Sequence, residues 1–435
     1  MHFKVKPGGI IQGKARVPGD KSISHRAIML GALAEGTTRI SGFLEGEDAL
    51  ATLGAFRAMG VSVEGPEDGQ VVVHGVGLHG LKAPAVPLDL GNAGTGMRLM
   101  CGLLAGQAFD AELTGDASLR SRPMGRVIDP LTKMGAVIAA ADEGRPPLKV
   151  SGGARLQGIH YDLPMASAQV KSCLLLAGLY AQGCTEVTEP AATRDHTERM
   201  LRGFGYPVDT ENGAIALRGG GQLRACDIDI PADISSAAFF LVAASLVPGS
   251  DLLLTHVGIN PTRVGVLNIL TLMGADISLL NKREVGGEPV ADVRVRYAQL
   301  HGIEIPPQQV PLAIDEFPAL FIAAACARGR TVLRGAEELR VKESDRIAAM
   351  AEGLTTLGVF NKVLDDGIII EGGELGGGVI HTYHDHRIAM SFAVAALRAK
   401  DMITVLDCDH VATSFPGFDK LARQLGLRLE TGGQA

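Results

Sequence analysis

Lysine, arginine and hydroxyl side chains gather after a Pro-Gly turn near the start of the chain. Lys21, Ser22 and Arg26 follow the turn at 18–19, and an almost wholly apolar stretch, 27–34, comes next. This pattern predicts a buried helix that begins with the polar residues, where unpaired N–H groups and partial positive charge favour anions. We interpret the stretch as a site for an anion such as phosphate. A plain helix cap, which serine and aspartate favour, is the alternative.

Glycines and arginines mark two further segments. Gly94 and Thr95 lie in the segment 91–98, whose glycines let the backbone approach a ligand closely and whose threonine can cap a helix. The spacing matches neither a P-loop nor a dinucleotide-binding fingerprint. Arg122 lies in the basic loop 120–126, where arginines at a Pro-Gly turn suit a carboxylate or a phosphate. A glycine-rich helix entry and solvated surface arginines are the alternatives.

Another apolar segment begins after Ser167, Ala168 and Gln169. Ser167 and Gln169 can bind hydroxyls or phosphate oxygens at a helix end, although capping alone also explains Ser167. Arg194 lies in the polar run 193–199, which opens an amphipathic helix and contains Asp and Thr residues that can cap it.

Carboxylates join the cations in the second half of the chain. Asp315 precedes an apolar helix, where an acidic residue serves either as a cap or as a rigidly held general base. The densest run of charge, 340–346, contains Lys342, Glu343 and Arg346. If this run is helical, Lys342 and Arg346 share one face of the helix. A solvated face of salt bridges is the usual meaning of such a run.

Two histidines and an aspartate precede the last apolar segment. His384 and His386 flank Asp385 tightly, and no distant Cys, His or Glu set completes a metal site, so we expect no metal. Arg387 is a further residue that could donate hydrogen bonds to an anion. The six cysteines lie far apart without a Cys-x-x-Cys pair, which predicts free thiols and a reducing compartment.

Two patterns, each recurring about six times, predict the elements that position these residues. Apolar segments opened by polar residues recur at intervals of roughly 70 residues, and they begin near Ser22, Gly94, Ser167, Ser235, Glu316 and His386. Because these segments are apolar nearly all round, they predict helices surrounded by other elements. Glycines that end amphipathic segments before short strands predict helix C-caps, at Gly60, Gly135, Gly205, Gly274, Gly358 and Gly426.

The repeat of strand, buried helix, strand, amphipathic helix and paired strands predicts an α/β fold of two lobes with three repeats each. We expect one lobe over 20–231 and a second over 1–19 and 232–435, joined by a hinge near 18–20 and 231–233. A repeat of this length also fits a solenoid scaffold. The charged residues that open the buried helices argue against a scaffold, which has no need of them.

Composition excludes several classes of partner. The 435 residues favour two domains, and 46% of them are hydrophobic. A net charge of −7 disfavours general binding to nucleic acids or anionic membranes. No apolar signal segment follows Met1, and apolar runs such as 237–247 are too short to cross a bilayer. We therefore expect a cytoplasmic protein with small anionic substrates and no nucleic-acid or membrane partner.

Several motifs, in order along the chain, resemble those of the 5-enolpyruvylshikimate-3-phosphate (EPSP) synthase family. They are Pro18–Arg26, Gly91–Thr95, Arg122–Gly125, Val341–Arg346 and Asp385–Arg387, and the stretch 165–172 resembles the second bacterial subclass. The resemblance covers essentially the whole chain. It implies the inverted α/β barrel, with three βαβαββ units in each of two lobes that close on the substrate. It also implies transfer of the enolpyruvyl group of phosphoenolpyruvate to the 5-hydroxyl of shikimate 3-phosphate, a step of aromatic amino acid and chorismate biosynthesis that needs no metal or organic cofactor.

The resemblance also implies roles for individual residues. Asp315 should take the proton of the 5-hydroxyl, Glu343 should help to protonate the methylene carbon, and Lys21 should touch both substrates. Shikimate 3-phosphate should be held by Lys21, Ser22, Arg26, Ser167, Gln169 and Arg194. The phosphoenolpyruvate pocket should be lined by Gly94, Thr95, Arg122, Arg346 and Arg387. Further substrate contacts should come from Ala168, Asp315, Lys342 and His386.

The chain departs from the family pattern at two places. Many relatives have a lysine shortly before the final Phe-Pro, where this chain has Thr413 and Ser414, so that phosphoenolpyruvate contact is missing or replaced. Relatives also often have asparagine near Glu338. Glyphosate-tolerant relatives can carry alanine where this chain retains Gly94, so we expect glyphosate to inhibit.

Two other functions remain open from the sequence. The enolpyruvyl transferase that acts on UDP-N-acetylglucosamine shares the fold, but it usually has Lys-Asn in place of Lys21-Ser22 and a cysteine in a mobile loop, whereas 120–126 contains none. A non-catalytic anion-binding protein is the second possibility, although carboxylates at Asp315 and Glu343 would weaken pure anion binding. We expect a monomer.

Overall fold

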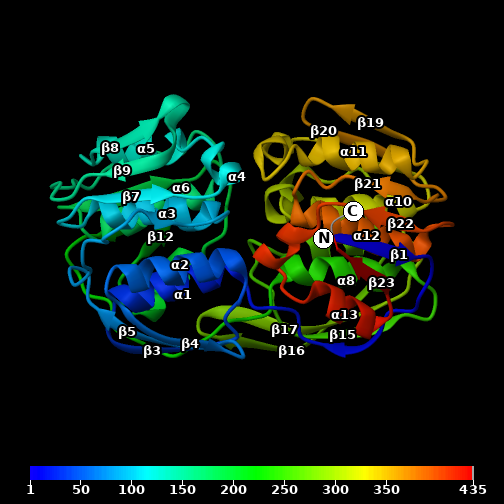
Figure 1. Ribbon diagram of the computed structural model, residues 1–435, viewed down its shortest axis with the longest axis horizontal. Coiled ribbons are helices and arrows are strands. Elements are labelled where there is room, and N and C mark those ends of the chain that lie inside the picture. Colours follow the sequence, from blue (N-terminus) through cyan, green and yellow to red (C-terminus); the bar gives the residue numbers. More distant parts are fainter. Residues whose placement is uncertain (434–435) are drawn as a thin grey trace. The chain divides into compact units, whose positions relative to one another are not determined.

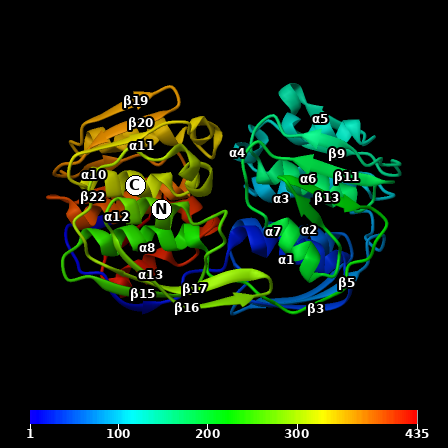
Figure 2. The same cartoon turned by 180° about the vertical axis from the view of Figure 1, so that it is seen from behind.

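Six small β-sheets carry the fold of residues 1–433, the part of the chain described by this computed structural model (Figures 1 and 2). The chain forms two compact units. Unit 2 comprises Gly19–Ile230 and Val285–Glu288, and unit 1 comprises Met1–Pro18, Pro231–Glu284 and the chain from Pro289 onward. Each unit contains its own hydrophobic core. Residues 434 and 435, which end the predicted second lobe, lie outside the described chain.

Unit 2 contains three sheets with two principal helices each. The first sheet has the order β14 (Ile228–Asp229), β3 (Glu35–Ser41), β5 (Gln70–Val76), β4 (Ser62–Glu67), with helices α1 (Lys21–Leu33) and α2 (Glu47–Ala58). The second has the order β6 (Leu88–Asp89), β7 (Ala111–Thr114), β9 (Arg145–Val150), β8 (Ile138–Ala141), with α3 (Gly94–Ala105), the short α4 (Ala117–Arg120) and α5 (Gly125–Lys133). The third has the order β10 (His160–Asp162), β11 (Cys184–Thr188), β13 (Ala214–Arg218), β12 (Asp209–Glu211), with α6 (Ala168–Gly178) and α7 (His196–Gly203).

Unit 1 repeats this plan. Its first sheet has the order β16 (Asp276–Val285), β17 (Glu288–Arg296), β15 (Asp251–Gly258), β2 (Gln12–Ala15), with α8 (Ile234–Leu246) and α9 (Gly265–Leu272). The second has three strands, β18 (Arg330–Leu333), β20 (Gly367–Glu371) and β19 (Asn361–Leu364), with α10 (Phe317–Cys326) and α11 (Arg346–Thr356). The third has the order β21 (Gly378–Ile380), β22 (Ile403–Val405), β1 (His2–Lys6), β23 (Arg428–Gly432), with α12 (His386–Ala395) and α13 (Phe418–Leu425).

The six predicted repeats share one sheet topology, in which two parallel strands continue into an antiparallel pair. In the second sheet of unit 2, β6 pairs parallel with β7, and β9 pairs antiparallel with both β7 and β8. Segments distant in sequence complete three repeats: β14 pairs with β3, β2 with β15, and β1 with β22 and β23. In the three-stranded sheet, the first strand found in the other repeats is reduced to isolated β-bridges formed by His301 and Glu304.

The apolar segments form the inner helices, as predicted. All thirteen residues of α8 are buried, and α8, α10 and α12 pack against one another within unit 1. In unit 2, α3 packs against both α1 and α6. The six glycines predicted to stop the outer helices all have positive φ, between +77° at Gly205 and +118° at Gly426. A left-handed residue ends a helix at low cost only when it lacks a Cβ, which explains the glycine at each stop.

No helix of residues 1–433 is long and apolar enough to cross a membrane.

Candidate functional site: an anion site and a carboxylate–arginine cluster

The first turn of α1 carries the cations predicted from the sequence. Asp20 caps the helix, since its Oδ1 accepts from the N–H of Ile23 at 2.9 Å, so the capping alternative is correct for this residue. Lys21 extends from the same turn and its Nζ lies 2.8 Å from Oδ2 of Asp48, at the start of α2. The cap therefore accounts for the aspartate but not for the lysine or for Arg26.

Arg26 is held in the interior of unit 2 by neutral oxygen atoms. Its Nε donates to Oγ1 of Thr197 at 2.7 Å, Nη2 to Oγ of Ser172 at 2.7 Å, and Nη1 to the backbone oxygen of Ser22 at 2.9 Å. Burial is the main cause that lowers the pKa of Arg26, to about 10, so the guanidinium remains charged at neutral pH. The positive charge of Arg194 also acts to lower the pKa of Arg26.

The N-termini of α3 and α6 meet beside this arginine-bearing helix. Gln169 donates from Nε2 to Oγ1 of Thr95 at 2.9 Å, and its Oε1 accepts from Nη1 of Arg98 at 2.8 Å. Thr95 is not the cap of α3, because the helix begins after Ala93 without a side-chain cap. Ser167 does cap α6, accepting from the N–H of Val170 at 3.4 Å, and Ala168 is the first residue of that helix.

The basic loop places one of its arginines against the glycine-rich segment. Arg122 donates from Nη2 to Oδ1 of Asn92 at 2.6 Å and to Oγ of Ser118 at 3.0 Å. A Cβ added to Gly94 would lie 3.1 Å from Nη1 of Arg122, so the glycine leaves room for the guanidinium. Arg120 and Arg126 are exposed, so the surface alternative is correct for those two.

The carboxylates of unit 1 surround Arg346, whose side chain is 1% exposed. Its Nε donates to Oδ2 of Asp385 at 2.8 Å, and its Nη2 to Oε2 of Glu343 at 2.6 Å. Nη1 lies 3.5 Å from Oδ1 of Asp315, and Nζ of Lys342 lies 3.4 Å from the same oxygen. Asp315 and Glu343 therefore both lie against the guanidinium of Arg346, and Lys342 joins the group through Asp315.

The run 340–346 is not the continuous helix that would place Lys342 and Arg346 on one face. A 3₁₀ helix, Glu337–Val341, ends before Lys342, and α11 begins only at Arg346. Asp345 caps α11, which requires non-helical backbone at that residue. The two cations nevertheless approach the same carboxylate, that of Asp315, and Lys342 also contacts Oε1 of Glu338 at 2.7 Å.

The start of α12 completes the cluster. Asp385 is its N-cap and accepts from the N–H of Arg387 at 2.9 Å, and His386 is the first helical residue. Burial opposes the charge of Asp385, but the Arg346 guanidinium outweighs it and lowers the pKa of the carboxyl. Burial likewise opposes the charge of Arg346, yet Asp385 and Glu343 together raise its pKa above the usual value. Both groups are therefore charged at neutral pH.

Helix α10 begins without a side-chain cap, so the capping alternative for the acidic pair before it is wrong. Glu316 occupies the N-cap position but makes no capping hydrogen bond. Its carboxylate instead accepts from the Ser235 hydroxyl and lies 3.8 Å from Nη2 of Arg263. Asp315, the other member of the pair, faces Lys342 and Arg346.

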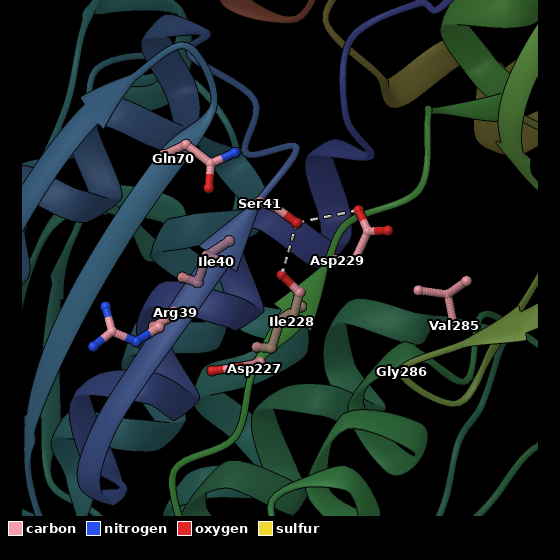
Figure 3. Close-up of a pocket in the computed structure, with 9 residues that line it drawn as sticks. All are labelled: Arg39, Ile40, Ser41, Gln70, Asp227, Ile228, Asp229, Val285 and Gly286. Atoms are coloured by element: carbon pink, nitrogen blue, oxygen red, sulfur yellow. Dashed lines mark hydrogen bonds between the residues drawn. The ribbon is translucent and has the colours of Figure 1, made fainter.

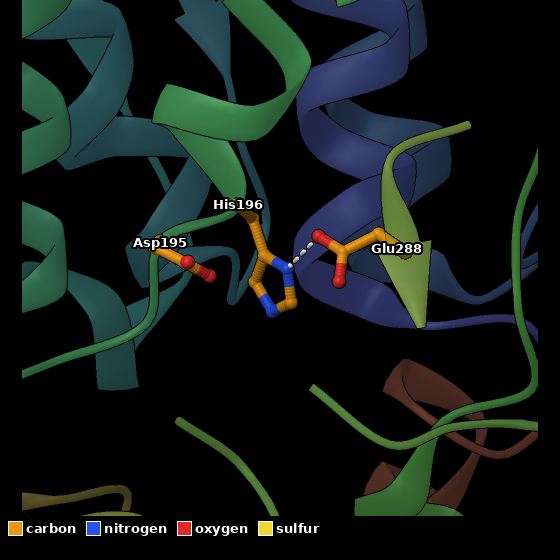
Figure 4. A group of neighbouring side chains, drawn as sticks. All are labelled: Asp195, His196 and Glu288. Atoms are coloured by element: carbon orange, nitrogen blue, oxygen red, sulfur yellow. Dashed lines mark hydrogen bonds and ion pairs between the residues drawn. The ribbon is translucent and has the colours of Figure 1, made fainter. Parts of the chain in front are cut away.

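A second group of side chains could in principle hold a metal ion (Figure 4). Ligand atoms of Asp195, His196 and Glu288 lie within 4.8 Å of one another in unit 2. However, Nδ1 of His196 lies 2.7 Å from Oε1 of Glu288, and Nε of Arg199 donates to Oδ2 of Asp195 at 2.8 Å. These contacts account for the three side chains without an ion.

A cavity of about 290 Å³ lies at the edge of the first sheet of unit 2 (Figure 3). Ser41 donates across it to Oδ1 of Asp229 at 3.2 Å, and Arg39, Gln70 and Asp227 also line it. None of the residues predicted for the site lies in its wall.

Three residues near the predicted site had no role assigned from the sequence. Asp48 pairs with Lys21, Asp385 holds Arg346, and Glu338 pairs with Lys342. Asp48 has the sequence appearance of an ordinary acid in the first turn of a helix. Asp385 lies in the motif 385–387 that resembles the family. The tight His-Asp-His spacing of residues 384–386 was the sequence feature that could have pointed to it. Asp48 and Asp385 become visible as partners only when distant segments come together, whereas Glu338 is four residues from Lys342 and their spacing was open to sequence reading.

Each unit thus offers a distinct chemistry. Unit 2 presents cations and hydroxyls at helix N-termini, which suit phosphate and carboxylate groups. Unit 1 places two carboxylates, Asp315 and Glu343, on one guanidinium, an arrangement that can transfer protons beside bound anions.

Comparisons with known proteins place the chain in one family. The family model for EPSP synthase (3-phosphoshikimate 1-carboxyvinyltransferase) matches residues 5–421. A 3-phosphoshikimate 1-carboxyvinyltransferase of Alkalilimnicola ehrlichii is 68% identical over 433 residues, which cover 99% of this chain and 97% of the relative. The 2.37 Å structure of EPSP synthase from Acinetobacter baumannii is 58% identical, with a TM-score of 0.90, and covers 99% of this chain and 100% of that one. The enolpyruvyl transferase NikO from Streptomyces tendae, at 18% identity and a TM-score of 0.81, covers 100% of this chain and 99% of its own and shares the fold. The chain belongs to the EPSP synthase (3-phosphoshikimate 1-carboxyvinyltransferase) family.

Proposed function

We propose that this chain transfers the enolpyruvyl group of phosphoenolpyruvate to the 5-hydroxyl of shikimate 3-phosphate, giving 5-enolpyruvylshikimate 3-phosphate and phosphate. Lys21, Ser22, Arg26, Ser167, Ala168, Gln169 and Arg194 hold shikimate 3-phosphate, with Lys21 also touching phosphoenolpyruvate. Gly94, Thr95, Arg122, Arg346 and Arg387 line the place of phosphoenolpyruvate, and Lys342 and His386 make further substrate contacts.

The two carboxylates on Arg346 support this proposal most directly. Asp315 and Glu343 lie on different nitrogens of one buried guanidinium, at 3.5 and 2.6 Å. A protein that only bound anions would gain nothing from two carboxylates at this place. A reaction in which an alcohol loses a proton while an alkene gains one requires a base and an acid held close together.

The proposed roles follow from that proton balance. Asp315 accepts the proton of the 5-hydroxyl as its oxygen bonds to C2 of phosphoenolpyruvate, and Glu343 delivers a proton to C3. The Glu343 carboxylate takes a proton back from C3 of the tetrahedral ketal as the C2–O bond to phosphate breaks. This releases the enolpyruvyl ether and phosphate, and the hydroxyl proton held by Asp315 leaves with the phosphate. The arginines and lysines stabilise the anionic groups throughout, since fixed charges in a buried site need no reorganisation.

Phosphate release with alternative acceptors tests the proposal. The purified protein is incubated with phosphoenolpyruvate and either shikimate 3-phosphate or UDP-N-acetylglucosamine. Release only with shikimate 3-phosphate is expected. Release only with the nucleotide sugar would assign the chain to the related transferase activity, and release with neither would favour an anion-binding protein.

We propose in addition that the chain is a cytoplasmic monomer whose lobes move about the crossings at 18–20 and 231–233. Near the second crossing, the N–H of Asp233 donates to the backbone oxygen of Pro18 at 2.9 Å, so the two crossing segments are joined. Light scattering should give the mass of one chain, 45.4 kDa. The radius of gyration from X-ray scattering should fall when both substrates are added, and an unchanged radius would contradict the hinge.

A further inference from the structure

Arg26 and Arg346 are both buried arginines, but their partners differ in kind. Arg346 is surrounded by carboxylates, whereas no carboxylate of residues 1–433 lies within 4.0 Å of the Arg26 guanidinium. Arg26 is 4% exposed, so its charge is neither neutralised by an ion pair nor well solvated. A buried cation without a counter-ion is costly, which indicates that an anion completes the site.

The hydrogen bonds to Arg26 also leave a specific part of the guanidinium open. A guanidinium has five N–H groups. Three of them are used, one each on Nε, Nη1 and Nη2, to Thr197, Ser22 and Ser172. The remaining two, one on each terminal nitrogen, have no acceptor within residues 1–433. Two N–H groups on the two terminal nitrogens form the fork that binds a carboxylate or phosphate through two oxygens.

Two hydroxyls set the orientation of this fork. Thr197 accepts from Nε and donates to Oγ of Ser172 at 2.7 Å, and Ser172 accepts from Nη2. Both side chains are buried, Thr197 at the start of α7 and Ser172 in α6. The chain of hydroxyls therefore joins two helices to one edge of the guanidinium and turns the opposite part toward a ligand.

A neighbouring lysine forms ion pairs with two buried glutamates of unit 2. Lys171 is 1% exposed, and its Nζ lies 2.7 Å from Oε1 of Glu198 and 2.9 Å from Oε2 of Glu189. Glu198 is the carboxylate with the largest electrostatic effect on Arg26. Lys171 holds Oε1 of Glu198, and Oε2 of that carboxylate is buried without a hydrogen-bond partner in the described part of the chain. Glu198 nevertheless forms no ion pair with Arg26, whose hydrogen bonds all go to neutral oxygen atoms.

We propose that Thr197 and Ser172 are positioning residues that present the uncompensated fork of Arg26 to an anionic group of shikimate 3-phosphate. The proposal rests on the function proposed above. It assigns Thr197 an effect on the affinity for shikimate 3-phosphate that acts through Arg26, without a contact to the reacting atoms.

The test compares Thr197→Val with Thr197→Ser and with a matched control, Thr185→Val. Thr185 is equally buried in unit 2, and its hydroxyl has no hydrogen-bond partner in the described part of the chain. For each variant, calorimetry gives the Kd of shikimate 3-phosphate alone, and phosphate release gives kcat and both KM values. We expect Thr197→Val to raise the Kd and KM for shikimate 3-phosphate about tenfold, the size of one hydrogen bond to a charged group. The kcat and the KM for phosphoenolpyruvate should change less than about twofold, and Thr197→Ser and Thr185→Val should resemble the wild type.

A double-mutant cycle with Arg26→Gln separates positioning from a structural role. If Thr197 acts through Arg26, Thr197→Val should change the Kd by less than about twofold in the Arg26→Gln background. An unchanged Kd in Thr197→Val, or an equal loss in both backgrounds, would overturn the inference. If Thr197→Val does not fold, Ser172→Ala provides the same comparison at the other hydroxyl. A wild-type protein that binds no shikimate 3-phosphate would overturn the proposed function as well, whereas an active wild type with an insensitive variant overturns this inference alone.

Discussion

At the scale of single residues, Gly94 shows how one missing side chain shapes a binding site. A Cβ at this position would lie 3.1 Å from Nη1 of Arg122 and 3.3 Å from Nη1 of Arg98, and both nitrogens end flexible side chains. Gly94→Ala should therefore fold normally but displace the arginines by a few tenths of an ångström. We expect the KM for phosphoenolpyruvate to rise about tenfold, as when one charge-assisted hydrogen bond is lost, and the inhibition constant of glyphosate to rise further.

Steady-state kinetics with and without glyphosate checks this prediction. Gly54→Ala, in the middle of α2 with no atom within 4 Å of the added Cβ, is the control and should leave both constants unchanged. Equal inhibition of the wild type and Gly94→Ala would contradict the role given to Arg122.

Another residue, His25, makes stability depend on pH. Burial, followed by the charges of Lys21 and Arg26, lowers the pKa of His25 to about 3, from an ordinary value of 6.5. The unfolded chain therefore takes up a proton between pH 6.5 and 3 that the folded protein does not, so this residue lowers stability as the pH falls through that window. The expected slope is about 1.4 kcal/mol per pH unit well inside the window.

Replacement by asparagine tests this effect. His25→Asn retains a polar atom near Nδ1, which lies 2.8 Å from Oγ1 of Thr52, but cannot titrate. Urea denaturation should show that the stability lost between pH 6.5 and 4.5 is smaller in His25→Asn than in the wild type. His301→Asn, at an exposed position, controls for removal of a histidine. Parallel pH profiles of the wild type and His25→Asn would contradict the assignment.

At the scale of elements, the buried helix α6 carries an ion triad that holds it against α7. Lys171 pairs with Glu189 and Glu198, and all three side chains are at most 7% exposed. Lys171→Met would leave two buried carboxylates without their counter-ion. We expect the free energy of unfolding to fall by about 3–5 kcal/mol, because breaking a buried ion pair leaves an uncompensated charge in the interior.

Chemical denaturation measures this loss. Lys149→Met breaks an exposed pair with Glu112, where Nζ and Oε2 are 3.7 Å apart, and should change stability by less than about 1 kcal/mol. A similar, small effect in both variants would show that the buried triad relaxes without penalty.

The elements were predictable where local sequence decides them. The six inner helices and the six glycine stops are set by apolar segments and by left-handed residues, which can be recognised within a few positions. The run 340–346 shows the limit, because its charges have a helical spacing while Asp345 interrupts the helix as a cap. What brings Lys342 and Arg346 together is Asp315, more than 20 residues away, and such a contact leaves no mark in the local pattern.

At the scale of the whole molecule, the two units have different proposed roles in the reaction. In this proposal, unit 2 supplies the hydroxyls and cations that bind shikimate 3-phosphate. Unit 1 supplies the two carboxylates that move protons, together with further cations, among them Lys342 and Arg346. Asp315→Asn and Glu343→Gln should each reduce kcat at least about a hundredfold, which is typical for loss of a general acid or base. The Kd of shikimate 3-phosphate measured by calorimetry should change far less than kcat. A near-normal kcat in either variant would show that the substituted residue does not have its assigned role.

Completion of repeats by distant strands is the part of the architecture least visible in sequence. The strand β1 pairs with β22 and β23, about 400 residues away, and the tip Val285–Glu288 of a unit 1 hairpin belongs to unit 2. The periodic pattern predicts six repeats and a second lobe that includes residues 1–19, but it contains no information about which sheet edge each returning strand fills. Register is decided by the side chains of the partner strands, as in the pairing of Phe3 with Val405.

Product analysis in deuterated water tests the central claim most directly. Phosphoenolpyruvate and shikimate 3-phosphate are incubated with the protein in deuterated solvent, and the product is examined by NMR. If addition and elimination proceed through a ketal, solvent hydrogen enters C3 during addition. We therefore expect two products: phosphate, and 5-enolpyruvylshikimate 3-phosphate that carries deuterium in its methylene group. Glu343→Gln should form this labelled product at least about a hundredfold more slowly. Absence of the product would contradict the function, and product without deuterium would contradict the proton transfer to C3.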